Sequence, residues 1–249
     1  MAARGQQALG MHKILNCAAA AVLCHGCADY APRDLDRARI AGKHNLALTG
    51  PMEPRQYGIF DTDAVLASAL TGAIVGIEAG QIAGQAATMP TDKPSVAAKL
   101  HLGQEIRSVL ISELEAENYR VTYFDAPRGT IGGTDFAADL SAAPVSSDLI
   151  MDCVVTAGYD NGTTRAYVPW IRLIVRLFDR KTMRPIFIHH FIYAGHDPDG
   201  SGPNAAVVAD QSYNYASRDE IISHPERAIR AFHSSVQPLA KLVADSIRQ

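Results

Sequence analysis

The second half of the chain alternates apolar and polar residues in runs that are typical of paired β-strands. One run covers residues 148–158, and a longer one covers residues 164–178. Between them, Asp160-Asn-Gly162 combines residue types that accept the positive φ angles of a tight hairpin turn. A third run, residues 185–193, follows a second turn. The pattern predicts a three-strand meander over about residues 148–193.

The longest predicted strand has one aliphatic face and one charged face. Successive side chains of a strand point to opposite faces of a sheet, so residues two apart share a face. We expect the aliphatic set to line the core, while Arg172 and Arg176 face another layer or solvent. The aliphatic set consists of Ile171, Leu173, Val175 and Leu177.

Apolar residues at helical spacing occur on either side of the meander. They recur every three or four positions over about residues 94–117, which predicts a helix there. Residues 217–220 place a serine three positions before a glutamate, the spacing of a capping box at the start of a helix. We expect Pro225 and Pro238 to divide the terminal helical region into pieces, the last of which spans about residues 226–248.

Shorter elements complete the expected fold. Residues 45–48 and 119–124 have the composition of short strands. Residues 125–147 contain several glycines and look irregular, with one turn of helix near residues 136–140. Together these elements predict an α+β fold, in which an antiparallel or mixed sheet is backed by helices.

A ridge of small residues runs through a further helical candidate, residues 61–87. Each helix-interior glycine costs about 1 kcal/mol relative to alanine, so their regular spacing implies a compensating contact. Close helix–helix packing with a partner chain is our hypothesis. The alternatives are a glycine-lined helix or helical hairpin within one domain, and a flexible insertion without function. Residues 64–77 are uncharged but number only 14, too few to span a bilayer. The ridge consists of Ser68, Gly72, Gly76, Gly80 and Gly84.

The N-terminal region has the layout of an export signal. Met11-His-Lys13 supplies a positive charge, and residues 14–24 form an apolar stretch. The following Leu23-Cys-His-Gly26-Cys27 resembles the bacterial lipobox, in which a small residue precedes a cysteine that receives a lipid and becomes the new N-terminus. This resemblance implies lipidation at Cys27, and Ala28 after it implies sorting to the outer membrane. The alternative is ordinary cleavage after Ala28, which would release a soluble periplasmic protein.

The chain is thereby expected to consist of four parts. Residues 1–26 form the signal peptide with an N-terminal extension, and residues 27–56 a tether. Residues 57–90 form the glycine-rich helical segment, and residues 91–249 the α+β domain.

Charge and cysteine content narrow the function classes. The chain carries a net charge of −3. Removal of residues 1–26 would leave 21 basic and 26 acidic residues, and no run of five basic residues occurs. We therefore expect no binding to nucleic acid. Of the four cysteines, only Cys153 lies outside the signal region, so no internal disulfide is expected in the processed chain, and Cys153 is expected to be a small core residue.

The sequence offers no catalytic or metal-binding motif that we recognise. His189 and His190 are adjacent on a predicted strand, so their side chains should leave opposite faces and not chelate one ion together. Asp197-Pro-Asp-Gly200 lacks the remaining ligands of a calcium loop and is interpreted as a turn. We expect no cofactor, no metal and no catalytic residues. The alternative is a periplasmic hydrolase whose active site lies near the loop 196–215.

The second half of the chain resembles a group of periplasmic bacterial lipoproteins. The resemblance is carried by Ser147-Asp-Leu-Ile-Met-Asp152, Val168-Pro-Trp-Ile-Arg-Leu173 and Phe178-Asp-Arg-Lys-Thr-Met-Arg-Pro-Ile186. These segments are similar to the N-terminal domain of TolB and the core of CsgG, and the likeness covers about residues 94–195 and the terminal helix. It implies a helix-backed sheet that works as an interaction module in envelope assembly or transport.

These inferences lead to one principal functional expectation. The chain is interpreted as an exported, lipid-anchored envelope protein, acting as an interaction module or an accessory subunit of a transport or secretion assembly. Its expected partners are the membrane, reached through the lipid, and either an envelope protein or a second copy of the chain.

Overall fold

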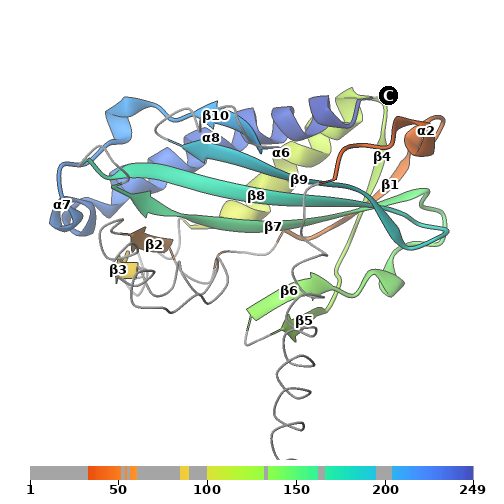
Figure 1. Cartoon of the computed structure of the whole chain (residues 1–249), viewed down its shortest axis with the longest axis horizontal. Coiled ribbons are helices and arrows are strands. Elements are labelled where there is room, and N and C mark those ends of the chain that lie inside the picture. Colours follow the sequence, from red (N-terminus) through yellow and green to blue (C-terminus); the bar gives the residue numbers. More distant parts are fainter. Residues whose placement is uncertain are drawn as a thin grey trace, which may run out of the picture.

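A mixed eight-stranded sheet forms the centre of the molecule (Figure 1). Its strands follow the order β10-β9-β8-β7-β1-β4, with β2 also paired to β7 and β3 paired to β2. The α+β class expected from the sequence is confirmed. The computed structural model describes residues 33–51, 54, 57–60, 85–89, 100–131, 134–161, 166–194 and 204–248.

The predicted meander is confirmed by three long antiparallel strands. β7 covers Leu149–Asp160, β8 covers Val168–Asp179 and β9 covers Arg184–Ala194. Their register places Cys153 opposite Val175 and Leu173 opposite Phe191. These residues therefore share one face of the sheet.

Residues 33–49 belong to the folded domain rather than to a tether. The strand expected near residue 45 is β1 (Asn45–Thr49), which lies between β7 and β4 and runs parallel to both. Leu46 and Leu48 of β1 are buried. Before β1, Arg33 pairs with Ile188 of β9 through backbone hydrogen bonds of 2.8 and 3.0 Å, and a short helix, α2 (Arg37–Ile40), follows. The burial of β1 on both sides anchors this segment in the sheet.

Strands lie near both ends of the predicted glycine-rich segment 57–90. β2 (Tyr57–Phe60) runs parallel to β7, and β3 (Gln85–Thr88) runs antiparallel to β2. The prediction of a helix over residues 61–87 is therefore wrong at its C-terminal end, where residues 85–87 belong to β3. A Cβ atom at Gly158 would lie 2.4 Å from the Gly58 carbonyl oxygen, so the close approach of β2 and β7 requires glycine there. The five ridge residues from Ser68 to Gly84 lie outside the described residues.

Two long helices cover one face of the sheet. α6 (Leu102–Ala116) starts later than the predicted residue 94, because Leu100 and His101 are not helical and His101 is its N-cap. α8 (Pro225–Ser246) continues through Pro238 instead of being divided there. Burial of Val236, Leu239 and Ala240 beside this proline offsets the roughly 3 kcal/mol that an interior proline costs a helix.

The main core lies between the meander and these helices. The aliphatic face predicted for β8 is confirmed, since Leu173, Val175 and the other two residues of the set are fully buried. Cys153 is buried in the same cluster as a free cysteine, as expected. The remaining members from α6 and α8 include Ile106, Leu110, Leu114, Phe232, Leu239 and Val243.

Several elements in loops were missed by the sequence pattern. β4 (Arg120–Phe124) is confirmed, but residues 125–147 hold a two-stranded hairpin, β5 (Arg128–Ile131) and β6 (Thr134–Ala138), where one turn of helix was expected near residues 136–140. β10 (Asn204–Val208) adds a parallel strand to β9. The short elements are η1 (Leu140–Ala142), η2 (Gln211–Tyr213) and α7 (Arg218–Ser223).

Candidate functional site

A buried carboxylate, Asp152 of β7, lies on the face of the sheet opposite α6 and α8. Its side chain is fully buried, and Arg176 from the neighbouring strand forms an ion pair with its Oδ2 atom. Arg128 Nη2 lies 2.8 Å from Oδ1 and Thr49 Oγ1 donates to the same oxygen at 2.8 Å. We call these four residues, Asp152, Arg176, Arg128 and Thr49, the buried ion cluster.

The buried ion cluster ties three parts of the chain together. Arg128 comes from β5, and its Nη2 atom also donates to the carbonyl oxygens of Gly50, at 2.7 Å, and Cys153, at 3.2 Å. Next to it, a small apolar cluster that includes Phe124 and Ala143 covers the end of β1 and β7. Two guanidinium groups and a hydroxyl thus compensate the cost of burying one carboxylate. The contacts describe a structural connection between β5 and the sheet.

The neighbouring cysteine is not a reactive group. Burial raises the pKa of the Cys153 thiol far above its usual range, and the adjacent Asp152 carboxylate acts in the same direction. The thiolate is the nucleophilic form of cysteine, so a thiol held protonated at the centre of the core is inert. The expectation of a core residue at this position is confirmed.

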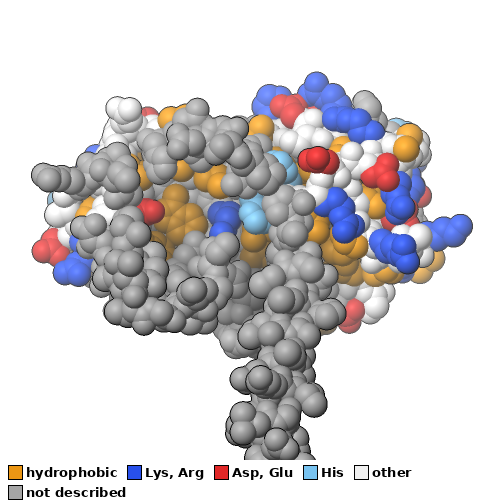
Figure 2. All heavy atoms as spheres, in the orientation of Figure 1, with side chains coloured by type: hydrophobic (Ala, Val, Ile, Leu, Met, Phe, Trp, Pro, Cys, Tyr) orange, Lys and Arg blue, Asp and Glu red, His pale blue; other side chains and the backbone are white. Residues whose placement is uncertain are grey.

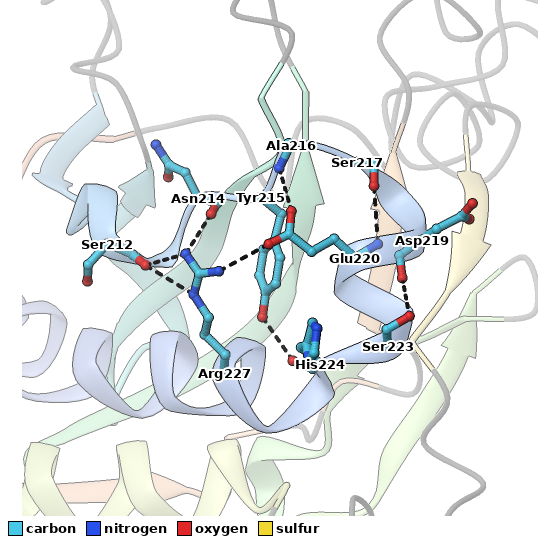
Figure 3. A network of polar contacts seen from close by, with 10 residues as sticks. All are labelled: Ser212, Asn214, Tyr215, Ala216, Ser217, Asp219, Glu220, Ser223, His224 and Arg227. Carbon is cyan, nitrogen blue, oxygen red and sulfur yellow. Dashed lines mark hydrogen bonds and ion pairs between the residues drawn. The ribbon is translucent and has the colours of Figure 1, made fainter.

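A second polar cluster lies where the chain enters α8 (Figure 3). We call residues 212–227 the α7–α8 corner. Arg227 donates from Nη2 to the carbonyl oxygens of Ser212, at 2.6 Å, and Asn214, at 2.8 Å. Its guanidinium carbon also lies 4.5 Å from the centre of the Tyr215 ring. One arginine thereby fixes the segment before α7 against α8.

The predicted capping box is part of this corner. The Glu220 backbone N–H donates to Ser217 Oγ at 3.2 Å, which confirms the expected N-cap. Glu220 Oε2 accepts from the backbone N–H of Ala216 at 2.9 Å, one residue earlier than in the usual reciprocal pair, and Oε1 faces Arg227 at 3.4 Å. The carboxylate is therefore engaged with backbone and with an ion-pair partner.

An open surface hollow of about 410 Å³ lies at the corner, lined by residues of α7 and the start of α8 and by none from the loop 196–215, where the alternative hydrolase site was expected. Ser223 Oγ donates to the Asp219 carbonyl oxygen at 2.8 Å within α7, rather than facing His224 as a nucleophile would face its base. Tyr215 donates its hydroxyl to the His224 carbonyl oxygen at 2.9 Å, and burial raises the pKa of Tyr215 to about 12. These contacts hold backbone in place and provide no observation that favours hydrolysis.

The other residues considered from the sequence lie apart from both clusters. His189 stacks on Phe187 at a ring-centre distance of 5.6 Å, and burial lowers the pKa of His189 below its usual value. His190 is opposite Ile174 on the other face of the sheet, so the two histidines diverge as expected. Cys27 and residues 197–200 lie outside the described residues.

Within the described part of the chain, no three histidine, cysteine or acidic side chains are grouped closely enough to hold a metal ion. No described helix has both the length and the apolar content needed to cross a membrane.

Comparisons with known proteins identify remote structural likeness alone. No family model matches the chain, and no curated protein matches it. A Xanthomonas campestris protein of the DUF330 family has a TM-score of 0.39 at 10% identity, over 82% of this chain and 85% of that one. A PelC dodecamer from Paraburkholderia phytofirmans has a TM-score of 0.35 at 10% identity, over 88% and 96%. A candidate lipoprotein from Caulobacter crescentus has a TM-score of 0.28 at 14% identity, over 59% and 78%.

These neighbours are bacterial and include a candidate lipoprotein. Their TM-scores are too low to support an argument about this chain, and the resemblance to TolB and CsgG is not confirmed by them.

Proposed function

We propose that this chain is exported and carries a lipid on Cys27, which holds it at the periplasmic face of the outer membrane. The observation that carries the proposal is the segment 14–27, where an apolar stretch ends in Gly26-Cys27. A lipidated cysteine adds an anchor to a chain whose described helices include none that could span a bilayer.

We further propose that the anchored domain acts as an interaction module, or as an accessory subunit of a transport or secretion assembly. This proposal is supported by the structural roles of the two polar clusters. The buried ion cluster joins β5 to the sheet, and the α7–α8 corner holds the segment before α7 against α8. Interaction through the small-residue ridge remains a hypothesis about residues 68–84.

The anchor is tested by the mass of the mature N-terminus. The full sequence is expressed in a bacterial host, membranes are isolated, and the N-terminal peptide is analysed by mass spectrometry after labelling with palmitate. We expect a diacylglyceryl group on Cys27, and its loss in the Cys27→Ala variant. Cys17→Ala is the matched control, because it removes a cysteine of the apolar stretch outside the lipobox-like segment and should leave the lipid in place. A mature chain that starts after Ala28 without a lipid would contradict the proposal.

The interaction module is tested separately by crosslinking in intact cells. We expect the lipidated chain to form a specific crosslinked species, either with itself or with an envelope protein. A chain that stays monomeric and uncrosslinked at its native level in the envelope would contradict this part of the proposal and leave the anchor unaffected.

A further inference from the structure

The folded domain begins only a few residues after the proposed lipid anchor. Six Cα–Cα steps separate Cys27 from Arg33, the first residue of the described fold. A fully extended chain advances at most about 3.6 Å per residue, so Arg33 lies within about 22 Å of the anchored cysteine. Because Arg33 is fixed to Ile188 of β9 by two backbone hydrogen bonds, this end of the sheet is held near the bilayer.

The same end of the sheet carries an excess of basic side chains. We define the basic patch as the charged residues of two adjoining segments, 33–44, which contains α2, and 179–184, which is the β8–β9 turn. The two segments hold seven lysines and arginines against three aspartates, whereas the whole chain has a net charge of −3. Figure 2 shows several lysine and arginine side chains, with acidic side chains between them, at the end of the molecule where α2 and this turn lie.

Contacts within the basic patch neutralise only part of its charge. Arg39 pairs with Asp36 at 2.9 Å, and Lys43 pairs with Asp179. By contrast, Arg33 donates to the Pro185 carbonyl oxygen, and this contact orients the guanidinium group without cancelling its charge. Arg37 and Arg180 likewise donate to backbone carbonyl oxygens, those of Arg248 and Ala143. Lys181 and Arg184 are exposed in the turn.

We propose that the basic patch binds the phosphate-bearing headgroups of anionic lipids in the membrane that holds the Cys27 lipid. The diacylglyceryl group already holds the chain at the membrane, and each basic residue near an anionic bilayer adds attraction that acts on the part of the domain that carries it. Met183, which is 39% exposed at the tip of the same turn, adds an apolar side chain to this surface. The domain is thereby oriented with the β8–β9 turn toward the bilayer and the α7–α8 corner away from it.

The length of β8 separates the α7–α8 corner from the basic patch. β8 begins beside Tyr167, which pairs with Tyr215 of the α7–α8 corner, and it ends at Asp179 in the basic patch. A strand of 12 residues is about 36 Å long. The corner is therefore well beyond the range of about 8 Å over which charges on a membrane surface act in physiological salt.

The geometric part of this proposal rests on the proposed lipid anchor, and the test separates the two. The processed chain is purified from the membrane and periplasmic fractions after expression of the full sequence, and its mass reports the lipid on Cys27 by itself. The lipidated chain is then placed in vesicles of phosphatidylcholine, with or without phosphatidylglycerol. Ala41→Cys carries a fluorescent probe in the patch, and Ala216→Cys carries it in the corner; Cys153 is buried and does not compete for the label.

Quenching of the probe by nitroxide-labelled lipid headgroups measures how close each site lies to the bilayer. We expect strong quenching at residue 41 that increases with phosphatidylglycerol, and weak quenching at residue 216. The triple variant Arg37→Gln, Lys181→Gln and Arg184→Gln should lose the dependence on phosphatidylglycerol. The control triple Arg218→Gln, Arg230→Gln and Lys241→Gln removes the same charge elsewhere and should keep it.

For the lipidated chain, either of two results would overturn the proposal. One is equal quenching at residue 41 in both lipid mixtures, and the other is an equal effect of both triple variants, which would mean that net charge alone governs binding. If the mass shows no lipid, the same processed chain is sedimented with vesicles containing phosphatidylglycerol. Removal of the three patch charges should then lower the partition coefficient about a hundredfold, at about fivefold per residue. Absence of sedimentation would refute the basic patch as a lipid site.

Discussion

Replacement of Asp152 by alanine tests whether the buried ion cluster stabilises the fold. The carboxylate is fully buried, and it is contacted by Arg176 on one oxygen and by Arg128 and Thr49 on the other. Its removal leaves two guanidinium groups, which are only 8% and 12% exposed, without their shared anion. Breaking a buried pair from one side typically costs about 3–5 kcal/mol, and we expect a loss of this size for Asp152→Ala.

Urea denaturation followed by circular dichroism measures that loss. For an m value of about 2–3 kcal/mol/M, the midpoint should fall by about 1–2.5 M. The double variant Asp152→Ala, Arg176→Met removes both charges of one pair and fills the space with an apolar side chain. It should be less destabilised than the sum of the two single variants by at least about 1 kcal/mol.

The control for this experiment is Asp219→Ala, because the Asp219 side chain is 85% exposed and lies 3.6 Å from Arg218. Its loss should remain below about 1 kcal/mol. The reasoning is refuted if Asp152→Ala costs no more than the control, or if the effects in the double variant simply add. Either result would mean that the cluster is hydrated or rearranges freely.

Three further predictions concern separate parts of the chain. The hydrogen bond from Lys43 lowers the pKa of Asp179 to about 2. The native chain should therefore be more stable than Asp179→Asn by roughly 2 kcal/mol above pH ~4, and this difference should vanish as the pH falls to about 2. A difference that grows on acidification contradicts this prediction. Leu173→Ala should cost about 2–5 kcal/mol in urea denaturation, and a loss below about 1 kcal/mol would mean that the two faces of β8 are reversed. Replacing Gly76 and Gly80 by leucine should abolish crosslinking to a partner while the domain stays folded, and unchanged crosslinking would exclude the ridge as the contact.

The meander could be predicted because its information is local. The signals used were the alternation of side chains, an Asn-Gly pair and a capping serine, and each of them influences the backbone within a few residues. The structure has β7, β8, β9 and the cap at Ser217 where the sequence predicted them. β1 was also found as a strand. Its position between β7 and β4 was not, because parallel pairing brings together residues such as Asn45 and Arg120 that no short-range pattern connects.

The buried ion cluster was missed for a physical reason. Asp152 on β7 and Arg176 on β8 fit the same alternating pattern whether their face of the sheet meets water or a second layer. The covering layer here includes β5, which supplies Arg128 from a glycine-containing segment that has no clear strand alternation. Burial of Asp152 therefore depends on a contact between segments that the sequence pattern treats separately.

The placement of residues 33–49 changes what the proposed lipid would do. A tether reaching to residue 56 would let the domain move tens of ångströms from the bilayer, and its surface charge would then matter little to anchoring. With β1 in the centre of the sheet and Arg33 fixed to β9, at most six steps of chain remain between lipid and fold. Insertion of a flexible glycine–serine segment before Arg33 should therefore weaken the effect of phosphatidylglycerol on quenching at residue 41 while leaving lipidation intact. The length of the connection and the charge of the basic patch act together, because the patch contributes only where the anchor holds it close.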